Sequence, residues 1–185
     1  APVPGTDRGS SIIGLPRTEA ILPRREQVSR EHYKVGDRIR AVVSDVKDSE
    51  ESRSPRVVLS RAVPALVRRL FEIEVPEIYD GIVEIKAVAR IAGLRSKIAV
   101  LSHDPKVDCV GACVGVRGAR VKSIVQEING EKVDIVRWSD DLETLLKNAV
   151  EPTEILEYYC GEGDDAMGVA VVRDEERDAV RGRRG

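Results

Sequence analysis

A G-x-x-G loop, Gly115-Val116-Arg117-Gly118, constrains this chain most, because it stands between two short helical patterns. Upstream, residues 111–114 can form a single helical turn. Downstream, apolar residues recur at i, i+3, i+4 and i+7, as on one face of an amphipathic helix: Val121, Ile124, Val125 and Ile128. Glycine lacks a Cβ, so the loop can turn tightly and approach another molecule closely. Because the second helix begins at the loop, its unpaired N–H groups and positive dipole end predict a phosphate-binding site.

The residues in and after this loop form the candidate binding site. In KH domains a G-x-x-G loop between helices clamps about four nucleotides of single-stranded RNA. The competing interpretation is a packing turn between two helices, and the flanking helical pattern favours the RNA clamp. For Lys122 a solvated surface position is the favoured interpretation. The candidate RNA-binding residues are Gly115, Val116, Arg117, Gly118, Arg120 and Lys122.

Apolar residues near the loop are candidates for a platform under the bases, namely Val114, Val121 and Ile135. For Ile135 packing in the core is the favoured interpretation. Trp138 can stack on a base, but a lone tryptophan at a strand end more often packs against its own domain. Aromatic residues make up 3% of the chain, so extensive base stacking is not expected.

The composition is that of a globular protein of one or two domains, with 185 residues, 42% hydrophobic and 34% charged. A net charge of −2 argues mildly against a nucleic-acid binder, yet a local cluster of cations suffices for phosphate contact. No apolar stretch approaches the length that spans a membrane, and no signal-peptide pattern opens the chain. Three cysteines fit a reducing cytoplasm better than a disulfide framework, so a cytoplasmic location is expected.

Catalysis, metals and cofactors have little support in the sequence. His32 and His103 lie far apart without paired cysteine spacing, so no zinc site is predicted. Cys109 and Cys113 lie four residues apart on a predicted helical turn and are interpreted as small core residues. No P-loop or dinucleotide-binding pattern is present. The chain is therefore expected to be no enzyme and to need no cofactor.

Short strands with turns between them predict a small β-barrel in residues 1–60. Residues 1–10 have no periodicity and are predicted to form a loop or a frayed end. The strand candidates are residues 12–13, 19–22, 38–46 and 56–60. Exposed arginines on this part either line an RNA-binding face or only solubilise the protein; they are Arg24, Arg25, Arg38 and Arg40.

The period changes to a helical one after residue 61, which predicts a second domain over residues 61–155. Its elements follow the order α-β-β-α-α-β-α, an α+β domain with one sheet covered by helices. The predicted helices are residues 63–71, 111–114, 121–128 and 142–149, and the predicted strands are residues 82–89, 96–101 and 132–138.

Four blocks of the chain resemble one family of transcription factors. Residues 110–121 and 131–141 closely resemble the first KH domain of the NusA family. Residues 17–23 and 57–61 are similar to the S-one-type OB barrel that precedes it, and residues 71–78 to the helix joining the two. The resemblance implies an α+β chain: a partial OB-fold β-barrel lacking its first strand, then a prokaryotic-type (type II) KH domain.

The last segment, residues 156–185, resembles the incomplete start of a second KH domain. Gly182, Arg183, Arg184 and Gly185 would be its glycine loop and are further candidate RNA-binding residues. Arg177 and Arg181 stand at positions that are normally apolar, and a KH unit without the part after its loop cannot complete a core. The segment is therefore expected to be poorly ordered. The absent initiator methionine and the ending within a motif predict a piece of a longer protein.

The resemblance also implies the function. A protein of this family is an RNA-binding transcription elongation, termination and antitermination factor. It would contact nascent single-stranded RNA and associate with RNA polymerase through the full-length protein, as a monomer. One alternative is an accessory region of an RNA-processing enzyme, although in polynucleotide phosphorylase the KH unit precedes the barrel, and here the barrel comes first. Another is a protein-interaction scaffold with a vestigial KH loop.

Overall fold

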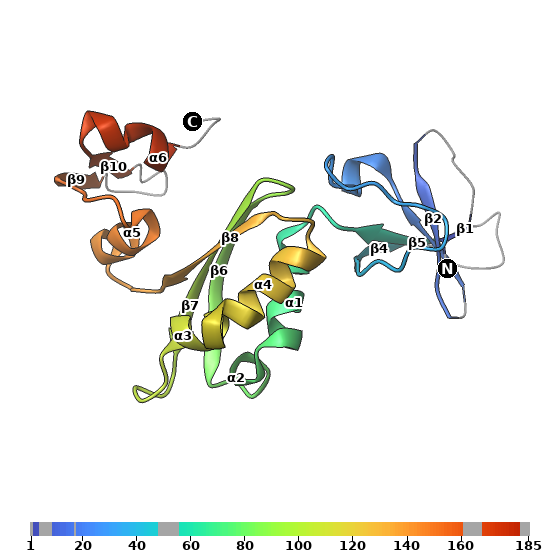
Figure 1. The fold of residues 1–185 in the computed structure, drawn as a ribbon, viewed down its shortest axis with the longest axis horizontal. Helices are drawn as coiled ribbons and strands as arrows, with labels where there is room; N and C mark the ends of the chain where they lie inside the picture. Colours follow the sequence, from blue (N-terminus) through green and yellow to red (C-terminus); the bar gives the residue numbers. More distant parts are fainter. Residues whose placement is uncertain (1, 4–8, 17, 48–55, 161–167, 182–185) are drawn as a thin grey trace. The chain divides into compact units, whose positions relative to one another are not determined.

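The computed structural model describes residues 2–3, 9–16, 18–47, 56–160 and 168–181 (Figure 1). Contacts between residues divide the chain into two compact units, Ala1–Ile135 and Val136–Gly185. The α+β class predicted from the sequence is confirmed. The domain boundaries after residues 60 and 155 stay predictions.

The first unit opens with a five-stranded sheet that carries its own small core. Its strands are β1 (Pro2–Val3), β2 (Ser11–Gly14), β3 (Glu19–Leu22), β4 (Val42–Lys47) and β5 (Arg56–Ser60). They lie in the order β1-β2-β3-β5-β4, antiparallel except for the parallel pair β3–β5. Alternation along the strands turns Ile13, Ala20, Leu22 and Leu59 inward.

Two predictions for this sheet need correction. The loop predicted for residues 1–10 is wrong at Pro2 and Val3, whose backbone pairs with Ile13 and Ile12 of β2. The strand predicted over residues 38–46 is β4, which runs over Val42–Lys47; the carbonyl of Arg40, before the strand, accepts a hydrogen bond from the Arg61 side chain instead.

A three-stranded sheet covered by helices follows (Figure 1); its elements keep the predicted order except that a second short helix, not predicted, precedes the first strand. The strands β6 (Val83–Ile91), β7 (Arg95–Ser102) and β8 (Lys132–Arg137) lie in that order across the sheet. The helices are α1 (Pro64–Glu74), α2 (Pro76–Tyr79), α3 (Cys109–Val114) and α4 (Ala119–Glu127). Helix α1 begins at Pro64. Proline suits the first turn of a helix, because the N–H group that it lacks would have no hydrogen-bond partner within the helix there.

The core of this domain lies between the helices and one face of the sheet. Helix α1 buries Leu66, Val67, Leu70 and Phe71, which recur at helical spacing. They pack with buried residues of the strands and of α3 and α4, and Cys109 and Cys113 are among them. Both cysteines are free thiols, as their interpretation as small core residues requires.

The second unit contains helix α5 (Leu142–Val150), strands β9 (Glu157–Cys160) and β10 (Gly168–Val171), and helix α6 (Arg177–Arg181). Asp141 caps α5 by accepting a hydrogen bond from the N–H of Thr144. Strands β9 and β10 pair antiparallel, so their backbone groups satisfy one another locally. The expected poor order of this last segment stays a prediction. The predicted loop at residues 182–185 lies outside the described residues.

Inside the first unit, buried ion pairs join the five-stranded sheet to the helical domain. Arg61, directly after β5, binds the Glu31 carboxylate through two N–H groups, each at 2.5 Å. The same guanidinium donates to the carbonyl of Glu127 at 2.8 Å, at the end of α4. The side chain of Asn129 adds a bond to the carbonyl of Arg30 at 2.9 Å. The sheet and α4 are thus fixed to each other through side chains that are mostly out of water.

A second buried pair, Arg90 and Glu131, lies in the turn region of the three-stranded sheet. The Glu131 carboxylate is 1% exposed and accepts hydrogen bonds from Arg90, from the hydroxyl of Ser96 and from the N–H of Gly93. Burial by itself raises the pKa of Glu131, but these hydrogen bonds outweigh burial and hold its pKa below 4.5. The ionised form is therefore the one that the fold stabilises.

Replacing this carboxylate, Glu131→Gln, should lower the free energy of unfolding by about 3–5 kcal/mol at neutral pH, because it leaves Arg90 charged and buried. The folded pKa lies below the unfolded one, so the stabilisation is complete above about pH 4.5 and is lost as the pH falls through the folded pKa. Urea unfolding of both proteins across this range should show a smaller acid-dependent loss in the variant. If the free energy of unfolding fell by the same amount in both proteins as the pH is lowered, a stabilising ionised Glu131 would be contradicted.

Candidate nucleic-acid interface

The glycine loop connects α3 to α4 through left-handed backbone positions. Gly115 has φ 74° and ψ 172°, Arg117 has φ 53° and ψ 25°, and Gly118 has φ 75° and ψ 19°. The N–H of Gly115 donates to the carbonyl of Gly111, which ends α3, and the N–H of Gly118 donates to the carbonyl of Gly115. Gly115 lies in a region that only glycine adopts readily, so the first glycine of the motif is required by the backbone itself.

The start of α4 is left without a side-chain cap. Gly118 occupies the N-cap position and has no side chain to accept from the first-turn N–H groups. Helix α3 differs, because Asp108 caps it by accepting from the N–H groups of Val110 and Gly111. The N–H of Ala119 donates to the carbonyl of Val116, but no side chain competes for the positive dipole end of α4, which therefore suits an acceptor from outside, such as a phosphate oxygen.

Two side chains project from the centre of the loop. Val116 is 84% exposed, and Arg117 is also exposed to solvent. Among the described residues no carboxylate lies within ion-pairing distance of Arg117. Its charge is therefore available to an anion bound at the start of α4.

The other two candidate cations are already engaged in the fold. Arg120 donates to the Glu77 carboxylate at 2.8 Å and to the carbonyl of Ala112 at 2.7 Å. Burial acts to raise the pKa of Glu77, but hydrogen bonds, one of them from Arg120, outweigh it and lower that pKa. Lys122 donates from Nζ to the carbonyl of Arg117 at 3.1 Å, which supports the left-handed turn.

The predicted apolar platform is brought together only in part. Val114 and Val121 are half-buried beside the loop, whereas Ile135 packs against the domain core, as the favoured interpretation held. Trp138 belongs to the second unit, where its indole N–H donates to Asp140 at 2.9 Å.

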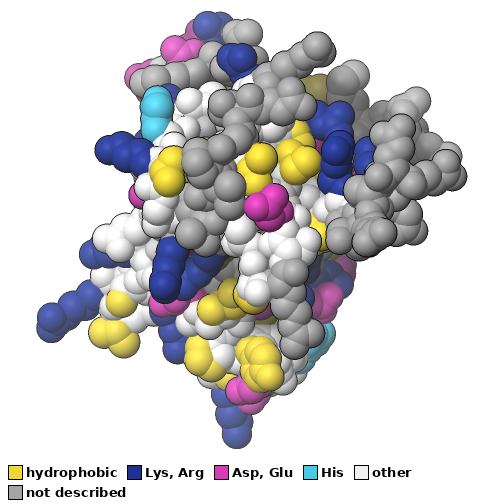
Figure 2. Space-filling model, turned by 90° about the vertical axis from the view of Figure 1, so that its right-hand side faces the viewer, with side chains coloured by type: hydrophobic (Ala, Val, Ile, Leu, Met, Phe, Trp, Pro, Cys, Tyr) yellow, Lys and Arg dark blue, Asp and Glu magenta, His cyan; other side chains and the backbone are white. Residues whose placement is uncertain are grey.

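The arginines of the five-stranded sheet are exposed, but some are paired. Arg25 lies 3.6 Å from the carboxylate of Glu26, and Arg40 lies 3.3 Å from that of Glu127. On the face drawn in Figure 2, Lys and Arg side chains lie at several separate places among hydrophobic and acidic ones. This face therefore carries no single broad basic surface.

Over the described ranges, no group of three His, Cys, Asp or Glu side chains has the arrangement of a metal site. Burial raises the pKa of the Cys113 thiol to about 12, so this cysteine is a poor nucleophile at neutral pH. None of the helices in the described part of the chain has the length and apolar character needed to cross a bilayer.

Comparison with known proteins agrees with this geometry. Residues 61–138 match the family model of the NusA-like first KH domain. Proteins named transcription termination/antitermination protein NusA from Halalkalibacterium halodurans and Bacillus subtilis are 46% and 47% identical to the chain over 173 residues. Those residues are 94% of this chain and 44% and 46% of the two relatives. The chain belongs to the NusA family. A relative of the same name from Thermus thermophilus is 45% identical over 149 residues, 80% of this chain and 38% of that protein. The chain thus spans less than half the length of these NusA relatives.

Sequence reasoning missed the partner that holds Arg120 in this NusA-type KH domain. Pro76 lies just after the end of α1 and opens α2 at the position where proline is favoured. Helix α2 carries Glu77, which binds Arg120 from 43 positions away. No local pattern signals a pair so distant in sequence.

The two loop glycines should respond differently to alanine. A Cβ on Gly115 would lie 2.8 Å from Cγ of Arg120, and its ψ is unfavourable for any side chain. A Cβ on Gly118 meets only ordinary contacts, the nearest at 3.6 Å. Gly115→Ala should therefore lower the free energy of unfolding by about 1–3 kcal/mol or more. Gly118→Ala should cost about 1 kcal/mol. Urea unfolding compares them, and equal losses would contradict this account.

Proposed function

We propose that this chain is an RNA-binding portion of a NusA-type transcription factor and that its glycine loop holds the backbone of single-stranded RNA. The observation that supports this most directly is the uncapped start of α4 at Gly118, with Arg117 exposed beside it. A phosphate can accept from the helix N–H groups, and Arg117 supplies a full positive charge at the same place.

The remaining members of the predicted site have supporting roles in this proposal. Val116 and the half-buried Val114 and Val121 give apolar contact to bases next to the bound phosphates. Arg120 keeps the loop in shape through Glu77 rather than contacting RNA first, and Lys122 does so through the carbonyl of Arg117. The predicted contribution of residues 182–185 stays a prediction.

The five-stranded sheet offers a second, weaker surface on the same unit. Two weak sites joined rigidly gain affinity, because binding at one raises the effective RNA concentration at the other. Such an arrangement suits a factor that follows a nascent transcript during elongation, termination and antitermination. Association with RNA polymerase is a property that we assign to the full-length protein. A non-enzymatic, monomeric and cytoplasmic factor is the form proposed.

The loop is tested by a charge placed at the start of α4. Gly118→Asp should weaken binding of a labelled single-stranded RNA by about tenfold or more, because the carboxylate takes the place of phosphate and repels it. Gly130→Asp is the matched control. Gly130 lies past the far end of the same helix, its φ of 81° is close to the 75° of Gly118, and the substitution adds the same charge. Fluorescence anisotropy measures both, and circular dichroism checks the fold. Equal affinities in the two variants would overturn the clamp and favour a protein-interaction scaffold.

The role of Arg117 is tested by the salt dependence of binding. If its guanidinium replaces one condensed counterion, Arg117→Gln should reduce the slope of log affinity against log salt by about 0.7. Anisotropy titrations between about 50 and 200 mM salt give this slope. Lys106→Gln serves as the control, since Lys106 is an exposed cation outside both the glycine loop and the five-stranded sheet. An unchanged slope for Arg117→Gln would remove Arg117 from the phosphate contacts.

A further inference from the structure

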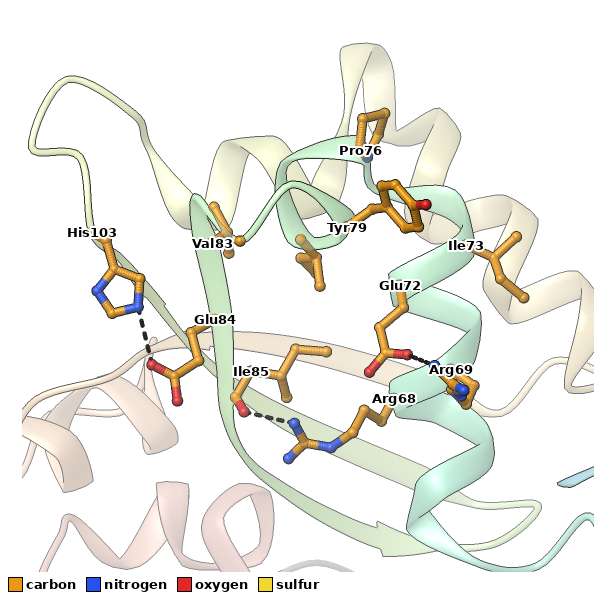
Figure 3. Close-up of a pocket in the computed structure, with 12 residues that line it drawn as sticks. Arg68, Arg69, Glu72, Ile73, Pro76, Tyr79, Val83, Glu84, Ile85 and His103 are labelled. Carbon is orange, nitrogen blue, oxygen red and sulfur yellow. Dashed lines mark hydrogen bonds and ion pairs between the residues drawn. The ribbon is translucent and has the colours of Figure 1, made fainter. Parts of the chain in front are cut away.

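A groove of about 800 Å³ lies beside the KH sheet, lined by α1, α2 and β6 (Figure 3). Its floor includes the buried side chains of Val83 and Ile85 from β6. Its rim carries two apolar side chains in solvent, Ile73 at 69% exposure and Tyr79 at 83%. Large apolar side chains this exposed beside a groove are typical of a surface that another molecule covers.

The groove runs along a free edge of the sheet. In the part of the chain that the structure describes, β6 is one of the two outer strands of this sheet. The N–H of His103 donates to the carbonyl of Ile82 across the β6–β7 pair, and this bonding alternates along an antiparallel ladder. The backbone N–H groups of Val83 and Ile85 therefore point away from β7. An extended segment can pair with such an edge.

Arg68 places one unneutralised charge at this edge. Its side chain is half-buried and donates through Nη1 to the outward carbonyl of Ile85 at 2.8 Å (Figure 3). Within the described residues no carboxylate lies within ion-pairing distance of it. Glu72, one turn further along α1, is bound by Arg69 at 2.5 Å. The guanidinium has five N–H donors, so most remain for a planar acceptor such as a carboxylate.

The charges around the groove decide between a peptide and a nucleic acid. Besides the Arg69–Glu72 pair, the lining holds His103 and Glu84, which lie 3.1 Å apart. Among the residues that line the groove, Arg68 is thus the arginine without a carboxylate partner, and the other charged side chains lie in pairs. A polyphosphate backbone needs several cations, whereas one carboxylate needs one. The backbone groups at the edge of β6 can pair with the N–H and C=O groups of an extended peptide, which RNA lacks.

We propose that this groove binds an extended, acidic peptide segment of a protein partner, which adds as a strand to the edge of β6. One carboxylate of the segment takes the free N–H groups of Arg68. An apolar side chain of the segment covers Ile73 and Tyr79. The site is separate from the glycine loop and does not depend on RNA binding there.

The test uses the whole chain, labelled with nitrogen-15, and two pools of capped peptides of about seven residues, a usual strand length. Flanking positions are drawn from valine, isoleucine, threonine, serine, leucine and tyrosine. The central residue is aspartate in one pool and asparagine in the other. The aspartate pool should shift the amide signals of Val83 and Ile85, and the asparagine pool should bind about tenfold more weakly.

Three variants of the chain make the result specific. Arg68→Gln should reduce the affinity for the aspartate pool to that for the asparagine pool. Tyr79→Ser, at a position too exposed to matter for folding, should weaken both pools alike. Lys106→Gln is the control, because it removes an exposed cation of the same domain outside the groove.

Other outcomes overturn the proposal. Absence of shifts with either pool, or equal affinities of the two pools, would exclude a peptide site that depends on Arg68. Shifts at Val83 and Ile85 caused instead by a single-stranded RNA of about ten nucleotides would make the groove a nucleic-acid site. Loss of RNA binding in Gly118→Asp leaves this test unaffected, so failure of the two proposals can be told apart.

Discussion

One fully bonded guanidinium, that of Arg61, helps to attach the five-stranded sheet to the KH domain, beside the Arg40–Glu127 pair and the bond from Asn129 to Arg30. Arg61 is only 3% exposed, and all five of its N–H donors are used. The Glu31 carboxylate takes two, the carbonyls of Arg40 and Glu127 take one each, and the Glu127 carboxylate takes the last. Burying a charge costs several kcal/mol unless its bonds are replaced this completely. A lysine, with three donors on one nitrogen, has no equivalent geometry.

This attachment matters for the glycine loop because of where Glu127 lies. Glu127 ends α4, and Gly118 starts it, so the helix that presents the loop is held at its far end by Arg61. At its near end Arg120 binds Glu77 of α2. The loop itself is short of side-chain support, apart from Lys122, and needs the helix behind it to stay in place. A rigid helix with an open N-terminus is what a phosphate site requires, since donors that are already aligned lose little entropy on binding.

Helix α2 separates two surfaces of different chemistry. Through Glu77 it supports the loop proposed for RNA, and through Tyr79 it borders the groove proposed for a peptide. The first surface offers a helix start without a side-chain cap and an exposed arginine, which suit an anionic polymer. The second offers a strand edge, two apolar side chains and a single half-buried cation, which suit an extended peptide. The two proposals therefore assign partners of different class to different surfaces of one small domain.

Much of this architecture follows from the sequence alone. Helical spacing of Leu66, Val67, Leu70 and Phe71, and the G-x-x-G spacing, determined the helices, the turn and the order of elements, because these depend on residues close together in the chain. Glycine at position 115 was likewise determined locally, by a backbone geometry that other residues avoid. Only the tertiary structure decided which cations are available. Arg120 and Arg117 look alike in the sequence, yet one is bound by Glu77 from 43 positions away and the other faces solvent. Arg61 and Arg68 likewise differ only in the folded chain, where Arg61 is paired with carboxylates and Arg68 is bound to a carbonyl. The burial and pairing of a charge depend on contacts between distant segments, which a local pattern does not contain.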